Sequence, residues 1–152
     1  MIDIINEPKE EVYFSLLENA LSYCSLFSLI IRNSEKNNSI SMLLQNLNKY
    51  LIKKSYESEW PGTKLLFGHK AELFQYDFNL RSYGIIKDVT NRLFGWYEPI
   101  LPEDLCLYHR DDNEPWLVTI SHENDGYFIP RENEIVNLCE KVKGLKKCLD
   151  NT

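Results

Sequence analysis

The side chains of this sequence that could do chemistry gather between residues 98 and 134. Two histidines, His109 and His122, are candidate metal ligands, and Cys106 lies near enough to His109 in sequence to raise the question of a Cys–His dyad. The carboxylates of this stretch could also supply the pair that glycoside hydrolysis requires. A small hydrolase would have its acidic site around four residues: Glu103, His122, Glu123 and Asp125.

Strand spacing argues against the metal pair and the dyad. The segments LCLYHR and PWLVTIS flank DDNE, a loop rich in turn formers, and so predict a β-hairpin. In this hairpin His109 faces Trp116, six residues before His122, which is roughly 20 Å at about 3.3 Å per residue. Two ligands of one metal ion cannot lie so far apart. Cys106 and His109 are an odd number of residues apart and point to opposite faces. We therefore expect no metal, no cofactor and no enzymatic activity.

The same hairpin predicts which side chains form the core. Closing it sets Arg110 opposite Pro115. One face then carries five apolar side chains and a histidine: Leu105, Leu107, His109, Trp116, Val118 and Ile120. The dipeptide DG at residues 125–126 is a strong two-residue turn signal, which predicts a second hairpin with His122 opposite Ile129.

The charge of the chain is unevenly distributed. Residues 98–134 hold ten acids against Arg110 and Arg131, a balance of −8, whereas residues 1–97 hold 11 of each sign. Acidic surface argues against nucleic acid, whose phosphates require Lys and Arg. It fits a basic protein partner, and the plainer alternative is a solvated face. The candidate partner-binding residues are Trp96, Tyr97, Glu98, Glu103, Asp104, Asp111, Asp112, Glu114, Glu123 and Asp125.

Apolar periodicity predicts the elements that position these residues. Four helices are expected at about residues 9–23, from a cap at Asn38 or Ser39 to about Leu51, at about 79–94 and at about 131–149. Residues 24–32 favour a strand, with a helix left open. WPGT at 60–63 predicts a type II turn. The segment TKLLFGHKAELFQYD predicts a hairpin whose loop centres on His69 and Lys70 and whose shared face carries Leu65, Phe67, Phe74 and Tyr76.

These elements predict one α+β domain spanning residues 1–152, with a mostly antiparallel sheet of five to six strands covered by about four helices. No segment approaches the roughly 18–20 apolar residues of a membrane span, and the first residues read as no export signal. Four dispersed cysteines without a C-x-x-C pair are typical of reduced thiols. A cytoplasmic location without membrane association is therefore expected.

Three segments carry a resemblance to known proteins: EWPGT, YEPILPEDLCLY and PWLVTISHENDGYF. Over roughly residues 59–135 this pattern resembles small bacterial proteins that look like the immunity partners of polymorphic or contact-dependent toxins. The resemblance implies a cognate toxin as partner and assigns no catalytic residue.

Together these features favour a non-enzymatic cytosolic protein-binding module that neutralises a basic toxin. An inhibitor of a basic nuclease needs acids that mimic phosphate and aromatic residues that anchor the contact. Two alternatives remain open. One is the small hydrolase with Glu103, His122, Glu123 and Asp125, and the other is a structural subunit that uses an aromatic surface to form a homodimer.

Overall fold

The computed structural model describes residues 1–33 and 35–150. The α-helices of this part are α1 (Glu11–Ala20), α2 (Asn38–Leu47), α3 (Leu80–Ile86) and α4 (Glu134–Lys141). Its strands are β1 (Ile2–Asp3), β2 (Cys24–Ile31), β3 (Leu51–Glu57), β4 (Glu59–Trp60), β5 (Thr63–Lys64), β6 (Ala71–Asp77), β7 (Glu103–His109), β8 (Pro115–Ile120) and β9 (Asp125–Phe128). Short 3₁₀ helices are η1 (Asn48–Tyr50), η2 (Leu93–Gly95), η3 (Ser121–Glu123) and η4 (Lys146–Cys148). None of the helices described has the length and apolar character that crossing a membrane requires.

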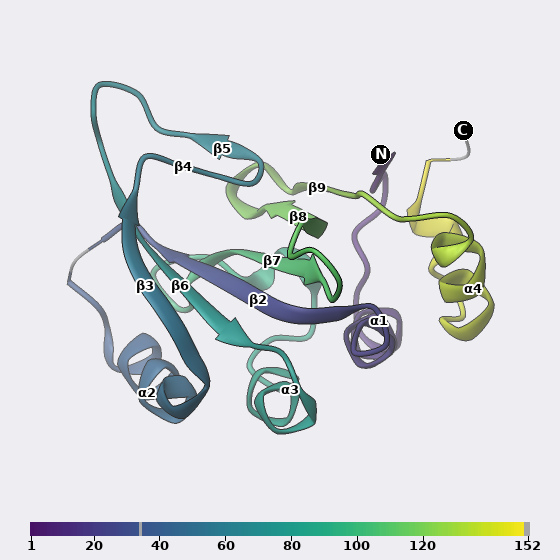
Figure 1. The fold of residues 1–152 in the computed structure, drawn as a ribbon, viewed down its shortest axis with the longest axis horizontal. Helices are drawn as coiled ribbons and strands as arrows, with labels where there is room; N and C mark the ends of the chain where they lie inside the picture. Colours follow the sequence, from purple (N-terminus) through teal and green to yellow (C-terminus); the bar gives the residue numbers. More distant parts are fainter. Residues whose placement is uncertain (34, 151–152) are drawn as a thin grey trace.

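Seven strands form one sheet in the order β1-β9-β8-β7-β2-β6-β3, and every neighbouring pair is antiparallel. Helices α1, α2 and α3 lie on one side of this sheet, and the small β4–β5 hairpin lies over the other side (Figure 1). The α+β class and the antiparallel sheet are confirmed. The expected count of five to six strands is too low, because β1 is very short and β3 has no clear apolar alternation.

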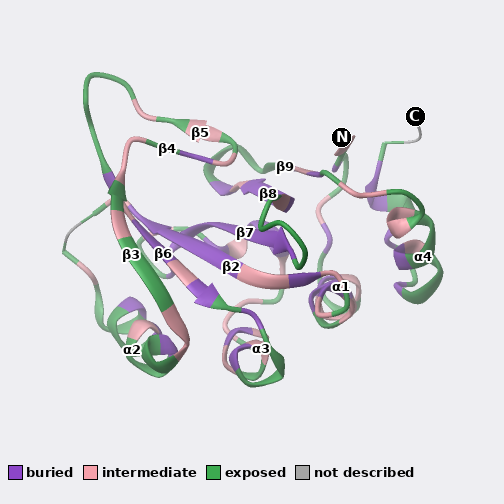
Figure 2. Ribbon diagram, in the orientation of Figure 1, coloured by how far each residue is buried: buried purple, intermediate pink, exposed green. Residues whose placement is uncertain are grey.

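The main core lies between the sheet and the helices. Strand β2 runs through the middle of the sheet and is buried along most of its length, whereas β3 at the edge is largely exposed (Figure 2). This core contains Phe27 of β2, Tyr76 of β6 and Trp116 of β8, together with Tyr13 of α1. The question left open for residues 24–32 is thereby answered: Cys24–Ile31 is a strand.

The second face of the sheet carries two smaller apolar clusters. Trp60 packs with Ile30 and Leu73 beneath the β4–β5 hairpin. Tyr108 and Val118 form the other cluster, farther along the sheet. Both faces of the central strands are therefore covered, which explains why all seven residues of β7 are buried.

The predicted hairpin of residues 63–77 is wrong. Strand β6 pairs with β3, with Lys54 opposite Phe74 and Glu57 opposite Ala71, and the β4–β5 hairpin is an excursion between them. Residue Phe67, expected on the inner face, is exposed with a positive φ of 58°. The WPGT turn does form. Gly62 takes a φ of 88°, in the region that the third position of a type II turn requires.

Both hairpins of the 101–128 stretch form with a register that differs from the expected one. A bulge between Leu107 and Tyr108 sets Leu107 opposite Leu117 and Tyr108 opposite Pro115. Val118, which was expected in the main core, consequently points to the second face. Leu117 lies in the main core instead. The turn takes an extra residue because Asn113 donates its backbone N–H to His109 O and adopts a positive φ.

The dipeptide DG lies in a strand and makes no turn. Ile120 pairs with Asp125 and Thr119 with Gly126, so the connection between β8 and β9 is η3, closed by Asn124 in the left-handed region. The sequence predicted that His122 faces Ile129. This prediction is wrong, because His122 lies in η3.

The four predicted helices exist, and all are shorter than expected. Helix α3 ends at Ile86 because the following chain turns back to hold the N-terminal segment, where Leu93 N–H donates to Pro8 O. Helix α4 ends at Lys141, and Gly144 with a φ of 88° separates it from η4. Helix α2 is capped by the side chain of Asn37, which accepts a hydrogen bond from Ile40 N–H.

Candidate functional site

Three of the segments that stood out in the sequence meet at one end of the sheet. Trp60, from WPGT, donates its indole N–H to Asp104 Oδ2 at 3.0 Å. The other carboxylate oxygen of Asp104, in LPED, accepts the backbone N–H of Ser121 at 2.9 Å, and Ser121 begins η3. Gly62 lies against Val118, so the β4–β5 hairpin is held down on the sheet beside these bonds. Asp104 therefore joins all three segments.

A bulge turns two consecutive acids inward at the start of β7. The pairing of β2 with β7 shifts between Ser28 and Ile30, opposite Glu103 and Asp104. Asp104 adopts a φ of 54°, which Asp tolerates better than most residues, and such bulges re-aim side chains. Both acids are buried, although the sequence predicted them among the residues that contact a partner at the surface. Strand alternation would bury only one of them, and the bulge buries both.

Arg32 supplies the positive charge of this cluster. Its Nε lies 2.9 Å from Glu103 Oε2, and its Nη2 lies 3.9 Å from Asp104 Oδ2. The guanidinium also stacks on the ring of Trp60, with 5.3 Å from Cζ to the ring centroid. Arg32 was not among the residues predicted from the sequence. Its one signal was position, since a base at the end of a buried apolar strand needs a partner.

Two further ionisable side chains flank Glu103. Glu98 accepts the backbone N–H groups of Arg32 and Asn33 at 3.2 and 3.3 Å, and its charge acts on Glu103. Ligand atoms of His122, Glu103 and Asp104 all lie within 4.8 Å of one another. Burial raises the pKa of the Glu103 carboxyl, Arg32 opposes this rise, and the charges of Asp104 and Glu98 add to it.

The four residues of the hydrolase hypothesis meet only in part. Glu103 and His122 come together, and the exposed Glu123 approaches His122 Nε2 at 3.7 Å. Asp125 is exposed and accepts the N–H of Gly126. A hollow of about 400 Å³ lies at α4 and is lined by other residues, including Cys139 and Leu149. Glu103 and Asp104 thus use their buried charges to bind Arg32 and Ser121, which come from other segments of the chain.

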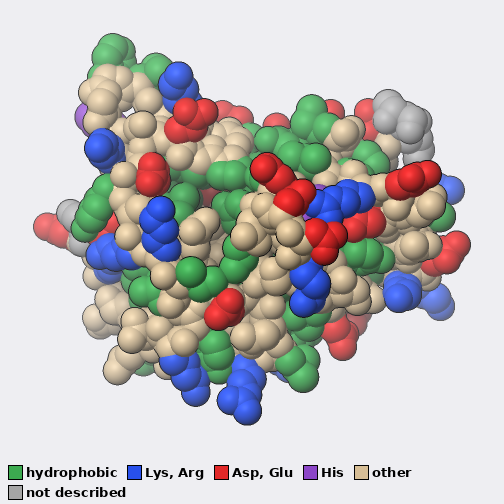
Figure 3. All heavy atoms as spheres, viewed as in Figure 1, with side chains coloured by type: hydrophobic (Ala, Val, Ile, Leu, Met, Phe, Trp, Pro, Cys, Tyr) green, Lys and Arg blue, Asp and Glu red, His purple; other side chains and the backbone are tan. Residues whose placement is uncertain are grey.

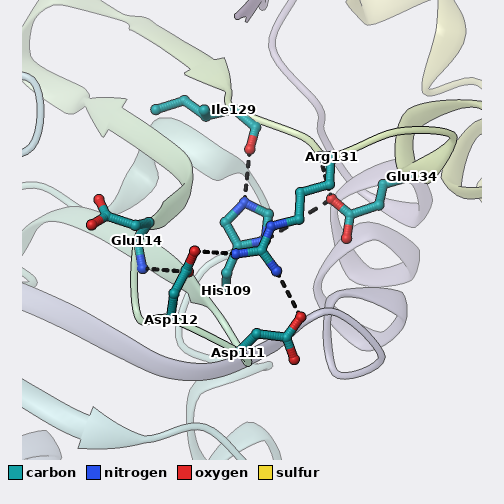
Figure 4. A network of polar contacts seen from close by, with 7 residues as sticks. All are labelled: His109, Asp111, Asp112, Glu114, Ile129, Arg131 and Glu134. Carbon is teal, nitrogen blue, oxygen red and sulfur yellow. Dashed lines mark hydrogen bonds and ion pairs between the residues drawn. The ribbon is translucent and has the colours of Figure 1, made fainter.

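The acids of the β7–β8 turn form a second, separate group (Figure 4). Arg131 binds Asp111 at 2.7 Å and also binds Asp112. Beside them the buried His109 makes a 2.8 Å hydrogen bond between its Nε2 and Ile129 O. Its Nδ1 lies 4.0 Å from the Glu134 carboxylate. This group ties the turn to the chain that leads into α4.

The two acidic groups lie at opposite ends of β7. Glu103 and Asp104 begin this strand, whereas His109 ends it, six residues or roughly 20 Å away. Acidic and basic side chains intermingle over the β7–β8 turn and α4 (Figure 3). The −8 segment therefore forms no single acidic surface. Backbone topology separates its acids, and Arg131 and Arg32 neutralise part of each group.

The two aromatic candidates differ in exposure. Trp96 is fully buried and donates its indole N–H to Tyr13 Oη at 3.0 Å, so the expectation that it anchors a partner on the surface is wrong. Tyr97 is 46% exposed and Ile100 is 67% exposed. The loop that carries them follows η2, which contacts η3. The loop of residues 97–100 thus starts from an element that contacts η3, where Glu123 lies.

Comparison of the chain with protein-family models, with curated proteins and with solved structures finds no match.

Proposed function

We propose that this chain is a non-enzymatic, cytosolic protein-binding module that neutralises a basic bacterial toxin. The contact surface is the loop of residues 97–100 together with η3 and the start of β9. It offers two exposed apolar side chains, Tyr97 and Ile100, together with the acids Glu98, Glu123 and Asp125.

The observation that carries this proposal is an exposed apolar loop that hydrogen bonds anchor to two neighbouring segments. Glu98 binds the backbone of Arg32, and the side chain of Asn37 donates to Pro99 O, so the middle of the loop is tied to the end of β2 and to the start of α2. A loop that is already ordered loses little conformational entropy on binding. Tyrosine at the centre of such a surface is typical of contacts that contribute most of the binding free energy.

The charges around the loop favour a basic partner. Glu123 and Asp125 are exposed, and no Lys or Arg of the described residues forms an ion pair with them. Acids around an apolar centre steer a basic protein towards the surface and exclude acidic competitors.

Affinity capture from the native host tests the proposal. The tagged parent chain should recover a basic protein, and the double variant Tyr97→Ser/Ile100→Ser should not. The matched control is Tyr56→Ser/Ile52→Ser on the β3 edge, where Tyr56 is 60% and Ile52 is 52% exposed, and it should recover the protein as the parent does.

The recovered protein must also be toxic by itself and lose its toxicity when mixed with the parent chain in equimolar amounts. Equal recovery by both double variants would contradict the proposed surface. A captured protein whose activity the chain leaves unchanged would contradict the neutralising function.

A further inference from the structure

We propose that Glu103, Asp104 and His122 form a binding site for a divalent transition-metal ion of the Zn²⁺ class. One carboxylate oxygen of each acid and one ring nitrogen of His122 lie within 4.8 Å of one another. Tetrahedral zinc with ligands at about 2.1 Å requires ligand atoms roughly 3.4 Å apart, which lies inside the 4.8 Å that bounds these atoms here. From the sequence, the only candidate metal pair was His109 with His122, and no metal was expected.

Unsatisfied polar atoms at the same place point to a missing ligand. The Glu103 residue is only 6% exposed, and its Oε2 lies 2.9 Å from Arg32 Nε as an ion pair without a hydrogen bond of good geometry. The buried Nε and Nη2 of Arg32 and the Oγ of Ser121, next to Asp104, also lack one. Buried polar groups are rarely left in this state, because each loses its bonds to water. A metal ion would take a lone pair of Glu103 Oε2, and a water bound to the ion would supply a hydrogen-bond partner for Ser121 Oγ.

The charge of the cluster leaves room for a further cation. The carboxylates of Glu103 and Asp104 share the single guanidinium of Arg32, and Glu98 adds a third carboxylate that accepts the backbone N–H of Arg32. Excess negative charge in a buried place is costly unless a proton or a cation compensates it.

Arg32 and the metal ion compete for the same carboxylates. The Arg32 side chain is 31% exposed, so its guanidinium has a path to solvent when a metal ion binds. Removing its charge should therefore strengthen metal binding. One imidazole with two carboxylates suits Zn²⁺ or Mn²⁺ better than Mg²⁺, which prefers oxygen ligands and keeps its waters.

Calorimetric titration of the tag-free, chelator-treated chain with ZnCl₂ tests the site without any protein partner, so its outcome is independent of the proposed function. The parent should bind one Zn²⁺, and MgCl₂ should give no comparable signal. His122→Ala should weaken Zn²⁺ binding by at least about tenfold. His69→Ala, which alters an exposed histidine in another loop, should bind as the parent does.

Arg32→Gln gives the second arm of the test and should bind Zn²⁺ more tightly than the parent. Circular dichroism of each variant establishes that it is folded. Absence of saturable binding, or binding that His122→Ala leaves unchanged, would overturn the proposal. If the folded Arg32→Gln variant bound Zn²⁺ with the affinity of the parent, Arg32 and the metal ion would not share the same carboxylates, which would overturn the proposed site.

Discussion

The indole N–H of Trp60 donates to the Asp104 carboxylate at 3.0 Å, although the two residues are 44 positions apart in the sequence. Both side chains are buried, Trp60 under the β4–β5 hairpin and Asp104 at the bulge of β7. This bond fixes the hairpin over the second face of the sheet. It also holds the carboxylate that accepts the N–H of Ser121 in η3.

Replacement of Trp60 by Phe should therefore destabilise the fold more than the loss of ring area implies. Phe keeps an aromatic ring but removes the donor, which leaves the buried Asp104 carboxylate with one partner fewer. Bonds to charged groups contribute about 1.5–3 kcal/mol, and we expect a loss of this size in the free energy of unfolding, measured by urea denaturation.

Trp96→Phe is the matched control, because it removes an equally buried indole N–H whose acceptor is the neutral Tyr13 hydroxyl at 3.0 Å. Its loss should be smaller, about 1 kcal/mol for the hydrogen bond. Equal losses in the two variants would mean that the charge of Asp104 does not matter.

Gly62→Ala should destabilise the protein by about 2–4 kcal/mol, from a left-handed backbone and overpacking together. A Cβ at this position would lie 2.9 Å from Val118 Cγ1 and 3.0 Å from Ile120 Cγ1. Gly68→Ala isolates the backbone contribution, since Gly68 also has a positive φ and nothing lies within 4 Å of its Cβ position. Thermal and urea unfolding should show a loss of only about 1–2 kcal/mol there.

The four cysteines, all free, should differ in reactivity. Burial raises the pKa of the Cys106 thiol to about 12, and it also raises the pKa of Cys24. Thiolates are the reactive form, so neither residue should be alkylated in the native protein at about pH 8. Cys139 is partly exposed and should react first, as peptide mass spectrometry would show. Rapid native labelling of Cys24 would contradict this packing of β2.

Alkaline pH should unfold the protein through its buried tyrosines. Burial raises the pKa values of Tyr13, Tyr76 and Tyr108 above the ordinary value near 10. A raised folded-state pKa favours the neutral folded form, so this stabilisation is complete below about pH 10 and declines as the pH rises above it. Tyrosinate absorbance should therefore rise in two stages, and the second should coincide with loss of the circular dichroism signal. A single stage at the ordinary pKa would contradict the burial.

Apolar periodicity was sufficient to predict the fold class and the presence of the four helices. It was insufficient where the chain uses polar residues for a tertiary purpose. Strand β3, with the sequence LIKKSYE, lies at the sheet edge, where lysines are tolerated and alternation is weak. The positive φ of Gly144 separates α4 from η4, and apolar periodicity does not reveal such a break.

The candidate site was only half predictable. Glu103, His122 and Glu123 were selected from their types, but the bulge that buries Asp104 and the turn η3 that brings His122 to Glu103 are non-local. A one-residue change in register moves every side chain of a strand to the other face. Arg32 joins the site from a segment about 70 residues away, and nothing in the local pattern identifies that pairing.

One measurement tests most directly whether the loop of residues 97–100 and η3 form the contact surface. It compares stopped-flow association with the captured partner for two single charge reversals, Glu123→Lys and Glu114→Lys. Both glutamates are exposed, one at each end of the β7–β8 hairpin. Charges near an interface mainly set the association rate and its salt dependence. The account predicts that Glu123→Lys slows association and flattens its salt dependence while Glu114→Lys leaves both unchanged, and the opposite order would contradict it.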